Sequence, residues 1–278
     1  MYNISINKIN ICQYDVINLT DLYIYSVDKE CLDFLNSLCC YTFKDNQEFK
    51  EAISLWFSDC HLCIKIYGHI TFWDTTNVTD MKNTFYGRHL FNDLLLWNTI
   101  NVVSAECMFH SAYSFNKPIY FKTDNIKIMT LMFFRAVEFN QRIFFNTKNV
   151  TEMVMMFECD YNFNSPIKIN TENVESMMGM FDQAFNFNQP INFNTKNVKS
   201  MNWMFNDCRK FNQKISFNTE KLKSTRCMFC DTHSLNSEII FTSTDNIIDI
   251  SHMFNNTFSL EEKNIKSLSR LINNFEEN

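Results

Sequence analysis

Two cysteines in the first quarter of the chain have the spacing of half a zinc site. Cys60 and Cys63 enclose two residues in the run Cys-His-Leu-Cys, and His69, Cys39 and Cys40 lie near them in the sequence. Sulfur and nitrogen ligands of this kind hold Zn²⁺ in structural sites, so metal binding is one interpretation. The simpler interpretation is that Cys63 packs in the interior, since free cysteine is a common small core residue. We predict no metal site and no cofactor.

The remaining histidines and cysteines form no recurring catalytic set. The histidines are His61, His69, His89, His110, His233 and His252. No Asp or Cys recurs at a fixed offset from them, whereas nucleophilic catalysis needs a base, an orienting group and a pocket. Cys227 and Cys230 repeat the two-residue spacing but occupy positions that the repeat described below fills with other residue types. We predict no catalytic residue, and a thiol- or metal-dependent enzyme centred on Cys60 and Cys63 is the least favoured alternative.

The composition restricts the class of partner and the compartment. The formal charge is −6 and no Lys- or Arg-rich block is present, which argues against nucleic-acid binding because nucleic-acid binders need clustered cations. No apolar stretch reaches the ~18 residues of a membrane helix, and the start of the chain lacks the layout of a signal peptide. Eleven cysteines without a regular framework indicate free thiols in a reducing compartment. We expect a cytoplasmic, host-cytoplasmic or virion location and no membrane span.

A period of 24 residues dominates the chain. One aromatic column contains Phe85, Phe109, Phe133, Phe157, Phe181, Phe205 and Phe229 at steps of 24, and then Phe254 after a step of 25. A second column contains Phe91, Phe115, Phe139, Phe163, Phe187, Phe211 and Leu235, each followed by Asn. Self-similarity at such a period predicts units that stack and bury one another's apolar residues. We therefore predict an α/β repeat solenoid of eight coils.

Each unit contains two kinds of hydrophobic spacing. From Val174 to Ala184, apolar residues recur at intervals of three and four, which predicts a short helix or helical turn. Ile191 and Phe193 alternate with Asn, which predicts a short strand. The three prolines, Pro118, Pro166 and Pro190, share one unit position, so the strand should begin at the residue that follows.

Asparagine replaces glycine and proline, of which there are only three each, as the turn-forming residue. One Asn column contains Asn77, Asn101, Asn125, Asn149, Asn173, Asn197 and Asn246. Asn tolerates left-handed backbone, and its amide satisfies local backbone groups. Stacked units should place these amides in ladders.

Both ends of the repeat region have helix signals. Asp45 with Glu48, and Ser259 with Glu262, are capping-box patterns that each precede an amphipathic run. A repeat stack needs such caps because its terminal units expose an apolar face. The predicted organisation is an N-terminal segment of unknown role at 1–44, a helical cap at 45–72, the eight-coil solenoid at 73–255 and a C-terminal capping helix at 256–278.

Several of these motifs resemble one known family. The run WDTTNVTDM at residues 73–81, the recurring Met-Phe and Phe-Asn-Gln-Pro-Ile, and the preceding Leu-Trp and Tyr-Gly-His-Ile resemble the BspA-like leucine-rich-repeat surface proteins, also described as mycoplasma lipoprotein-type repeats. The resemblance covers residues 44–255. It implies a leucine-rich-repeat-like fold and a role in adhesion or protein binding, in bacteria and in large DNA viruses of protists. It implies no catalytic residue. The chain lacks the family's lipoprotein cysteine and wall anchor, which favours an intracellular or virus-encoded member.

The predicted function is a non-catalytic scaffold for protein–protein interactions. The unit position after the strand's first Ile varies, and it is aromatic at Tyr120 and Phe144, with Arg142 nearby. Exposed aromatic residues and Arg are typical interface anchors, so we predict that Tyr120, Arg142 and Phe144 bind a protein partner. We expect the chain to be monomeric or weakly self-associating. An extracellular or virion-surface adhesin is the main alternative, and glycans at the Asn-Val-Thr sequons of Asn77 and Asn149 would favour it.

Overall fold

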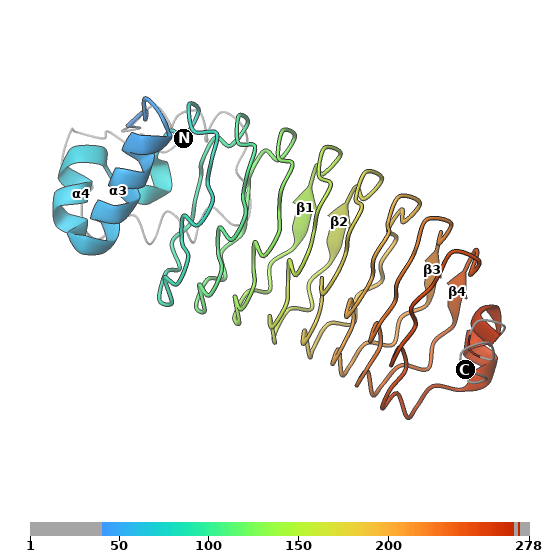
Figure 1. Ribbon diagram of the computed structural model, residues 1–278. Helices are drawn as coiled ribbons and strands as arrows, with labels where there is room; N and C mark the ends of the chain where they lie inside the picture. Colours follow the sequence, from blue (N-terminus) through green and yellow to red (C-terminus); the bar gives the residue numbers. More distant parts are fainter. Residues whose placement is uncertain (1–40, 270–271, 273–278) are drawn as a thin grey trace, which may run out of the picture.

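The computed structural model describes residues 41–269 and 272. Two α-helices, α3 (Asn46–Ser58) and α4 (Cys60–Tyr67), and a 3-10 turn, η1 (Ile70–Phe72), come first. The repeat units follow as loops stacked side by side in one row, and a 3-10 helix, η2 (Glu262–Leu268), lies at the far end (Figure 1). Most of the predicted N-terminal segment, 1–44, lies outside the described residues. Its last residues pair with the first unit, since Thr42 and Asp74 form a parallel bridge.

Successive units are held in parallel register. A chain of bridges joins equivalent residues of neighbouring units, and it runs through Asp80, Ser104, Ile128, Glu152, Ser176, Ser200, Ser224 and Asp249. Two short parallel pairs lie on another side of the stack, β1 (Ile143–Phe145) with β2 (Ile167–Ile169), and β3 (Ile215–Phe217) with β4 (Ile239–Phe241). The strands are too short and too few to close a sheet.

The prediction of a strand in every unit is wrong. Outside β1 to β4, the described part of the strand column adds only the single bridge between Leu95 and Ile119. Ile191 and Phe193 are buried and Asn192 between them is exposed, so the alternating burial is kept where the ladder is not. The segment is only about three residues long between turns, as in β1 to β4. Burial of its apolar side chains holds it in place without a complete ladder of backbone hydrogen bonds.

Each unit was predicted to contain a short helix or a helical turn, and the described units have no helix there, because the Met-Phe segment is a run of hydrogen-bonded turns. Alternate N–H groups donate within the unit to the carbonyl three residues earlier, as Met108 does to Ala105 at 3.2 Å. The N–H groups between them donate to the next unit, as Phe109 does to Met132 at 2.9 Å. An α-helix would direct all of these N–H groups to its own carbonyls. Two positions per unit take positive φ, such as 54° at Cys107.

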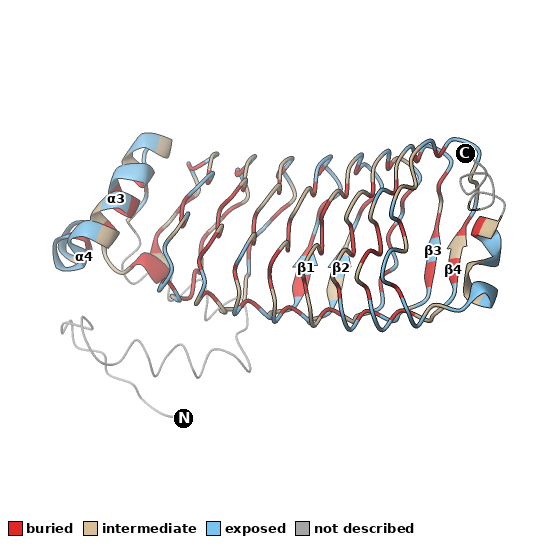
Figure 2. Ribbon diagram, turned by 60° about the horizontal axis from the view of Figure 1, so that its bottom comes forward, coloured by how far each residue is buried: buried red, intermediate tan, exposed pale blue. Residues whose placement is uncertain are grey.

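The core consists of two stacked aromatic columns. Phe133 lies 5.5 Å from both Phe109 and Phe157, with ring planes within 4° of parallel. The second column lies against the first, with Phe157 and Phe163 centroids 4.3 Å apart. Each fully buried ring contributes about 1.5 to 3 kcal/mol. Buried and exposed residues alternate along each loop, and the alternation recurs from unit to unit along the row (Figure 2).

The expectation that Asn amides form ladders is confirmed. The Asn149 amide nitrogen donates to the Asp124 carbonyl at 2.7 Å, and equivalent bonds recur in the neighbouring units. A second Asn column links units through its side-chain oxygens, as when the Asn164 N–H donates to the Asn140 amide oxygen at 2.9 Å. A buried threonine column adds a third ladder, which the sequence analysis did not identify.

The two ends differ. Helix α3 begins after Asp45, whose carboxylate accepts from the Gln47 and Glu48 N–H groups, and its buried residues Phe49, Ala52, Ile53 and Trp56 face the stack. At the other end, the predicted capping helix does not begin at Ser259. It begins at Glu262 as a 3-10 helix with no side-chain cap, and it has non-helical backbone at Ile265. Residues 273–278 lie outside the described part.

Candidate functional site

The predicted binding residues lie on one exposed edge of the strand column, which we call the strand face (Tyr120, Arg142 and Phe144). In β1, Ile143 and Phe145 are buried and Phe144 points outward with 60% of its surface exposed. Tyr120 occupies the same position one unit earlier and is 53% exposed. Arg142 lies two residues before Phe144 and is exposed. The side-chain alternation of an extended segment therefore turns all three residues outward.

The strand face has a local positive charge and no paired acid within the described residues. The unit position of Arg142 is occupied by Pro118 and Pro166 in the neighbouring units, so no carboxylate lies beside it in register. Three units after Arg142, the same position carries Lys214, whose ammonium pairs with Glu238 at 2.6 Å. Lys168 pairs in register with Phe144. The strand face thus combines two large rings with one guanidinium group, that of Arg142, which can meet an acidic or aromatic partner.

Two columns of flat, partly exposed side chains beside the turn runs were not predicted from the sequence. Tyr86, His110 and Phe134 stack in successive units with centroids 4.4 and 4.5 Å apart. Further along, Phe185 lies between Tyr161, at 4.6 Å, and the Arg209 guanidinium, at 4.0 Å. The sequence contains a pattern that could have predicted these columns: aromatic residues recur at the 24-residue step, one and four positions after the core Phe.

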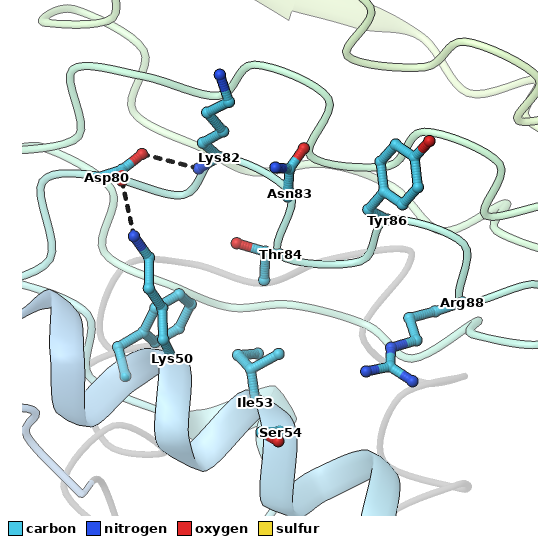
Figure 3. A pocket seen from close by; sticks show the side chains of 10 residues that line it. Lys50, Ile53, Ser54, Asp80, Lys82, Asn83, Thr84, Tyr86 and Arg88 are labelled. Atoms are coloured by element: carbon cyan, nitrogen blue, oxygen red, sulfur yellow. Dashed lines mark hydrogen bonds and ion pairs between the residues drawn. The ribbon is translucent and has the colours of Figure 1, made fainter.

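A cavity of about 390 Å³ separates α3 from the first unit (Figure 3). Its walls include Lys50 and Ser54 on the helix and the turn run from Asp80 to Arg88. Burial alone would raise the pKa of Asp80, but hydrogen bonds from the Lys50 ammonium at 2.9 Å and the Lys82 N–H lower it. The one carboxylate of this lining is therefore already ionised and bonded, and it is not poised as a general acid.

The Cys60 and Cys63 thiols are held in their protonated form. The Cys63 side chain is buried, and its thiol donates to the Ala52 carbonyl at 3.4 Å. Burial, reinforced by the neighbouring Cys60 and Asp59, raises the pKa of Cys63 to about 12. Burial and nearby carboxylates also raise the pKa of Cys60. Since the thiolate is the nucleophile and the metal ligand, this environment opposes both uses of the pair.

His69 is a packing residue. Its ring lies edge-on to Trp56 at 5.0 Å, and burial lowers its pKa. Cys39 and Cys40 lie outside the described residues. Within residues 41–269 and 272, no three His, Cys, Asp or Glu side chains converge as a metal site would require. None of the helices in that part of the chain is both long and apolar enough to cross a bilayer.

A cluster of acids in the middle of the stack is electrostatically unusual. Asp160 is fully buried, and both of its carboxylate oxygens lack a partner among the described residues. Burial and then Glu138 raise its pKa well above the usual range. Burial and then Asp182 raise the pKa of Glu158 to about 7, against the opposing charge of Arg135. Burial raises the pKa of Asp182 to about 6. Glu158 and Asp182 therefore change protonation near neutral pH.

The structure is that of a repeat protein whose 24-residue units stack in parallel register. The chain belongs to the family described as Mycoplasma protein of unknown function, DUF285, whose model matches residues 51–169, 120–192, 144–239 and 167–268. The overlapping matches are consistent with a repeat protein of the mycoplasma type. No curated protein and no solved structure matches the chain.

Proposed function

We propose that the chain is a non-catalytic scaffold that binds a protein partner through the strand face. The observation that carries the proposal is the outward projection of Tyr120 and Phe144 from the same position of adjacent units. The exposed Arg142 lies beside them and forms no ion pair with another described residue. Large exposed aromatic side chains and Arg contribute most of the binding energy in typical interfaces. The family assignment is compatible with this role and adds no catalytic function.

The architecture supports the same proposal. We infer a leucine-rich-repeat-like solenoid in which the Phe columns and the Asn ladders hold each unit against the next. Residues of the strand face are therefore presented on a backbone fixed from inside, by Ile143 and Phe145, which are buried. A rigid presenting surface loses little conformational entropy on binding. A repeat stack of this kind favours an extended partner that contacts several units.

The experiment compares two triple-alanine variants of the full chain. The first replaces Tyr120, Arg142 and Phe144. The matched control replaces Lys168, Asn192 and Ser216, which occupy the same unit position as Phe144 in the next three units and are also exposed. Both variants and the unsubstituted chain are incubated with native lysate, and the captured proteins are identified by mass spectrometry.

We expect one or more proteins to be retained by the unsubstituted chain and the control and to be lost with the first variant. Circular dichroism must show that both variants keep the fold. Equal capture by both variants would remove the strand face from the binding surface. No specific capture by any of the three would refute the scaffold function in the lysate tested.

A further inference from the structure

The turn runs connect neighbouring units through a row of four backbone donors. In the last joint of the stack, the N–H groups of Thr225, Cys227, Phe229 and Asp231 donate to the carbonyls of Asp249, Ser251, Met253 and Asn255, at distances of 2.8 to 2.9 Å. The donors are alternate residues of one unit, and so are the acceptors of the next. The same arrangement recurs in the preceding joints of the stack.

The final unit repeats the donor row without a following unit to receive it. The equivalent N–H groups belong to Ile250, His252, Phe254 and Asn256, and no hydrogen-bond acceptor for them lies among residues 41–269 and 272. The backbone has the conformation of the inner units, with φ of 59° at His252 and 58° at Asn256. His252 and Asn256 are exposed, and Ile250 and Phe254 are half-buried. Among the described residues, these donors therefore form an aligned row without acceptors on the last unit.

The terminal helix η2 covers the strand β4 of the last unit and not its turn run. The Ser267 hydroxyl donates to the Ile239 carbonyl at 2.9 Å and accepts from the Phe241 N–H at 3.3 Å, so β4 is covered. Figure 1 shows η2 beside β4, at the end of the row of units. The turn run of the last unit has no such cover among the described residues, which leaves its donor row as an unpaired edge.

Apolar side chains accompany the open donor row. The Phe254 ring stacks on Phe229 at 5.7 Å and ends the first aromatic column. Phe258, at one end of the row, has 82% of its surface exposed, and Ile248, at the other end, has 73% exposed. An unpaired row of N–H groups with apolar neighbours is the arrangement to which extended segments add through main-chain hydrogen bonds.

We propose that the open donor row, the N–H groups of residues 250, 252, 254 and 256, is a docking edge for an extended segment of a different protein. The segment would supply backbone carbonyls at alternate residues, as each unit does for the one before it, and an apolar side chain to cover Phe254. This edge is separate from the strand face, so it would add a second interface to the proposed scaffold. Its binding assay is independent of the capture experiment on the strand face.

A second copy of the chain is not suited to this position. The carbonyl row that would complement the donors belongs to the first unit, at Asp80, Lys82, Thr84 and Tyr86. That row lies beside α3, and both line the same cavity (Figure 3). Two hydrogen bonds hold α3 there: the Lys50 ammonium donates to the Asp80 carboxylate, and the Asn46 side-chain oxygen accepts from the Thr79 N–H at 2.8 Å. Helix α3 would have to leave before another chain's last unit could stack there.

The test first asks whether the donor row is open, and then whether it binds. Amide hydrogen exchange in the full chain should be fast at residues 252, 254 and 256 and slow at 227, 229 and 231. The binding probe is a fluorescent peptide of sequence DMKNTFYGRHL, which copies residues 80–90 and offers carbonyls in the required spacing without cysteine. Fluorescence anisotropy measures its affinity, and hydrogen exchange in its presence should slow at residues 252, 254 and 256.

Two substitutions at one position separate the N–H from the side chain. Ile250→Pro removes one donor and places the proline ring at the edge of the row; the preceding residue, Asp249, forms a parallel bridge with Ser224, and a residue before proline favours such β-type backbone. Ile250→Ala shortens the side chain but keeps the donor. We expect the proline variant to weaken peptide binding about tenfold or more, and the alanine variant to bind within about threefold of the unsubstituted chain.

Four outcomes would overturn the proposal. Slow exchange at residues 252, 254 and 256 in the free chain would mean that another part of the chain already covers the row. Absence of peptide binding at millimolar concentration would refute the docking edge itself. Equal loss with proline and alanine would assign binding to the side chain. Self-association in sedimentation experiments that disappears with Ile250→Pro would identify a second copy as the occupant.

Discussion

Asp160 is buried where other units carry small residues, and its replacement should stabilise the protein in a pH-dependent way. The equivalent residues in the adjacent units are Ala136 and Ala184, so the site tolerates a side chain without a carboxyl group. Both Asp160 oxygens are unpaired among the described residues, and an unsatisfied buried polar group costs about 1 to 3 kcal/mol. We therefore expect Asp160→Ala to raise the free energy of unfolding at pH 7.

The sign of the pH dependence follows from the raised pKa of Asp160 in the folded chain. In the unfolded chain the carboxyl group ionises near pH 4. Above that pH the unfolded state releases a proton that the folded state keeps, so stability falls as pH rises toward the folded pKa. The slope is at most about 1.4 kcal/mol per pH unit, so the advantage of Asp160→Ala over the unsubstituted chain should grow as pH rises, until the folded carboxyl group ionises.

The assay is urea unfolding of the full chain and the variant, followed by circular dichroism at several pH values from 4.5 to 7.5. Glu158 and Asp182 also have raised pKa values, but they are present in both proteins and largely cancel in the difference. A difference that does not change with pH would show that Asp160 is already ionised in the folded chain. A destabilised variant at pH 7 would show that the carboxyl group has a partner essential to the fold.

A second substitution tests the local geometry. Cys208 and Thr232 occupy the same unit position as Asp160, and each donates to a Phe carbonyl of the preceding unit, at 2.9 and 2.7 Å. The corresponding acceptor for residue 160 is the Phe133 carbonyl. Asp160→Thr should therefore be at least as stable as Asp160→Ala at pH 7, because its hydroxyl can make the same bond.

Three further predictions concern the core, the ladders and the thiols. Phe157→Ala should lower the free energy of unfolding by about 3 to 5 kcal/mol, measured by urea unfolding, because the ring is fully buried between stacked neighbours; a loss below about 1 kcal/mol would contradict the stacked core. Asn149→Ala should cost about 1 kcal/mol by removing the bond to the Asp124 carbonyl, and no measurable cost would show that water replaces that bond. Iodoacetamide at pH 7.5 should leave Cys63 unmodified in the folded chain, because the thiol is buried and its pKa is about 12. The same treatment in denaturant should alkylate Cys63, and mass spectrometry distinguishes the two results. Rapid alkylation in the folded chain would contradict the buried position of Cys63.

The sequence determined the repeat and the placement of the core. A 24-residue period with Phe at fixed positions identifies the residues that must face one another, since units of equal length bring equivalent positions into contact whatever the backbone does between them. The Asn ladders follow from the same register. The exposure of Tyr120 and Phe144 was predictable because side chains alternate along an extended segment whose Ile and Phe are buried.

The tertiary structure decided the backbone conformation and hydrogen bonding between the positions that recur every 24 residues. Apolar residues at intervals of three and four indicate a helix when hydrogen bonds are local, but here every second N–H donates to the next unit, and the segment becomes a run of turns. The periodicity of side chains does not reveal the destination of N–H groups. For the same reason the open donor row after Asp249 could not be predicted. It exists because η2 packs on β4 of the last unit and leaves the turn run without a partner among the described residues.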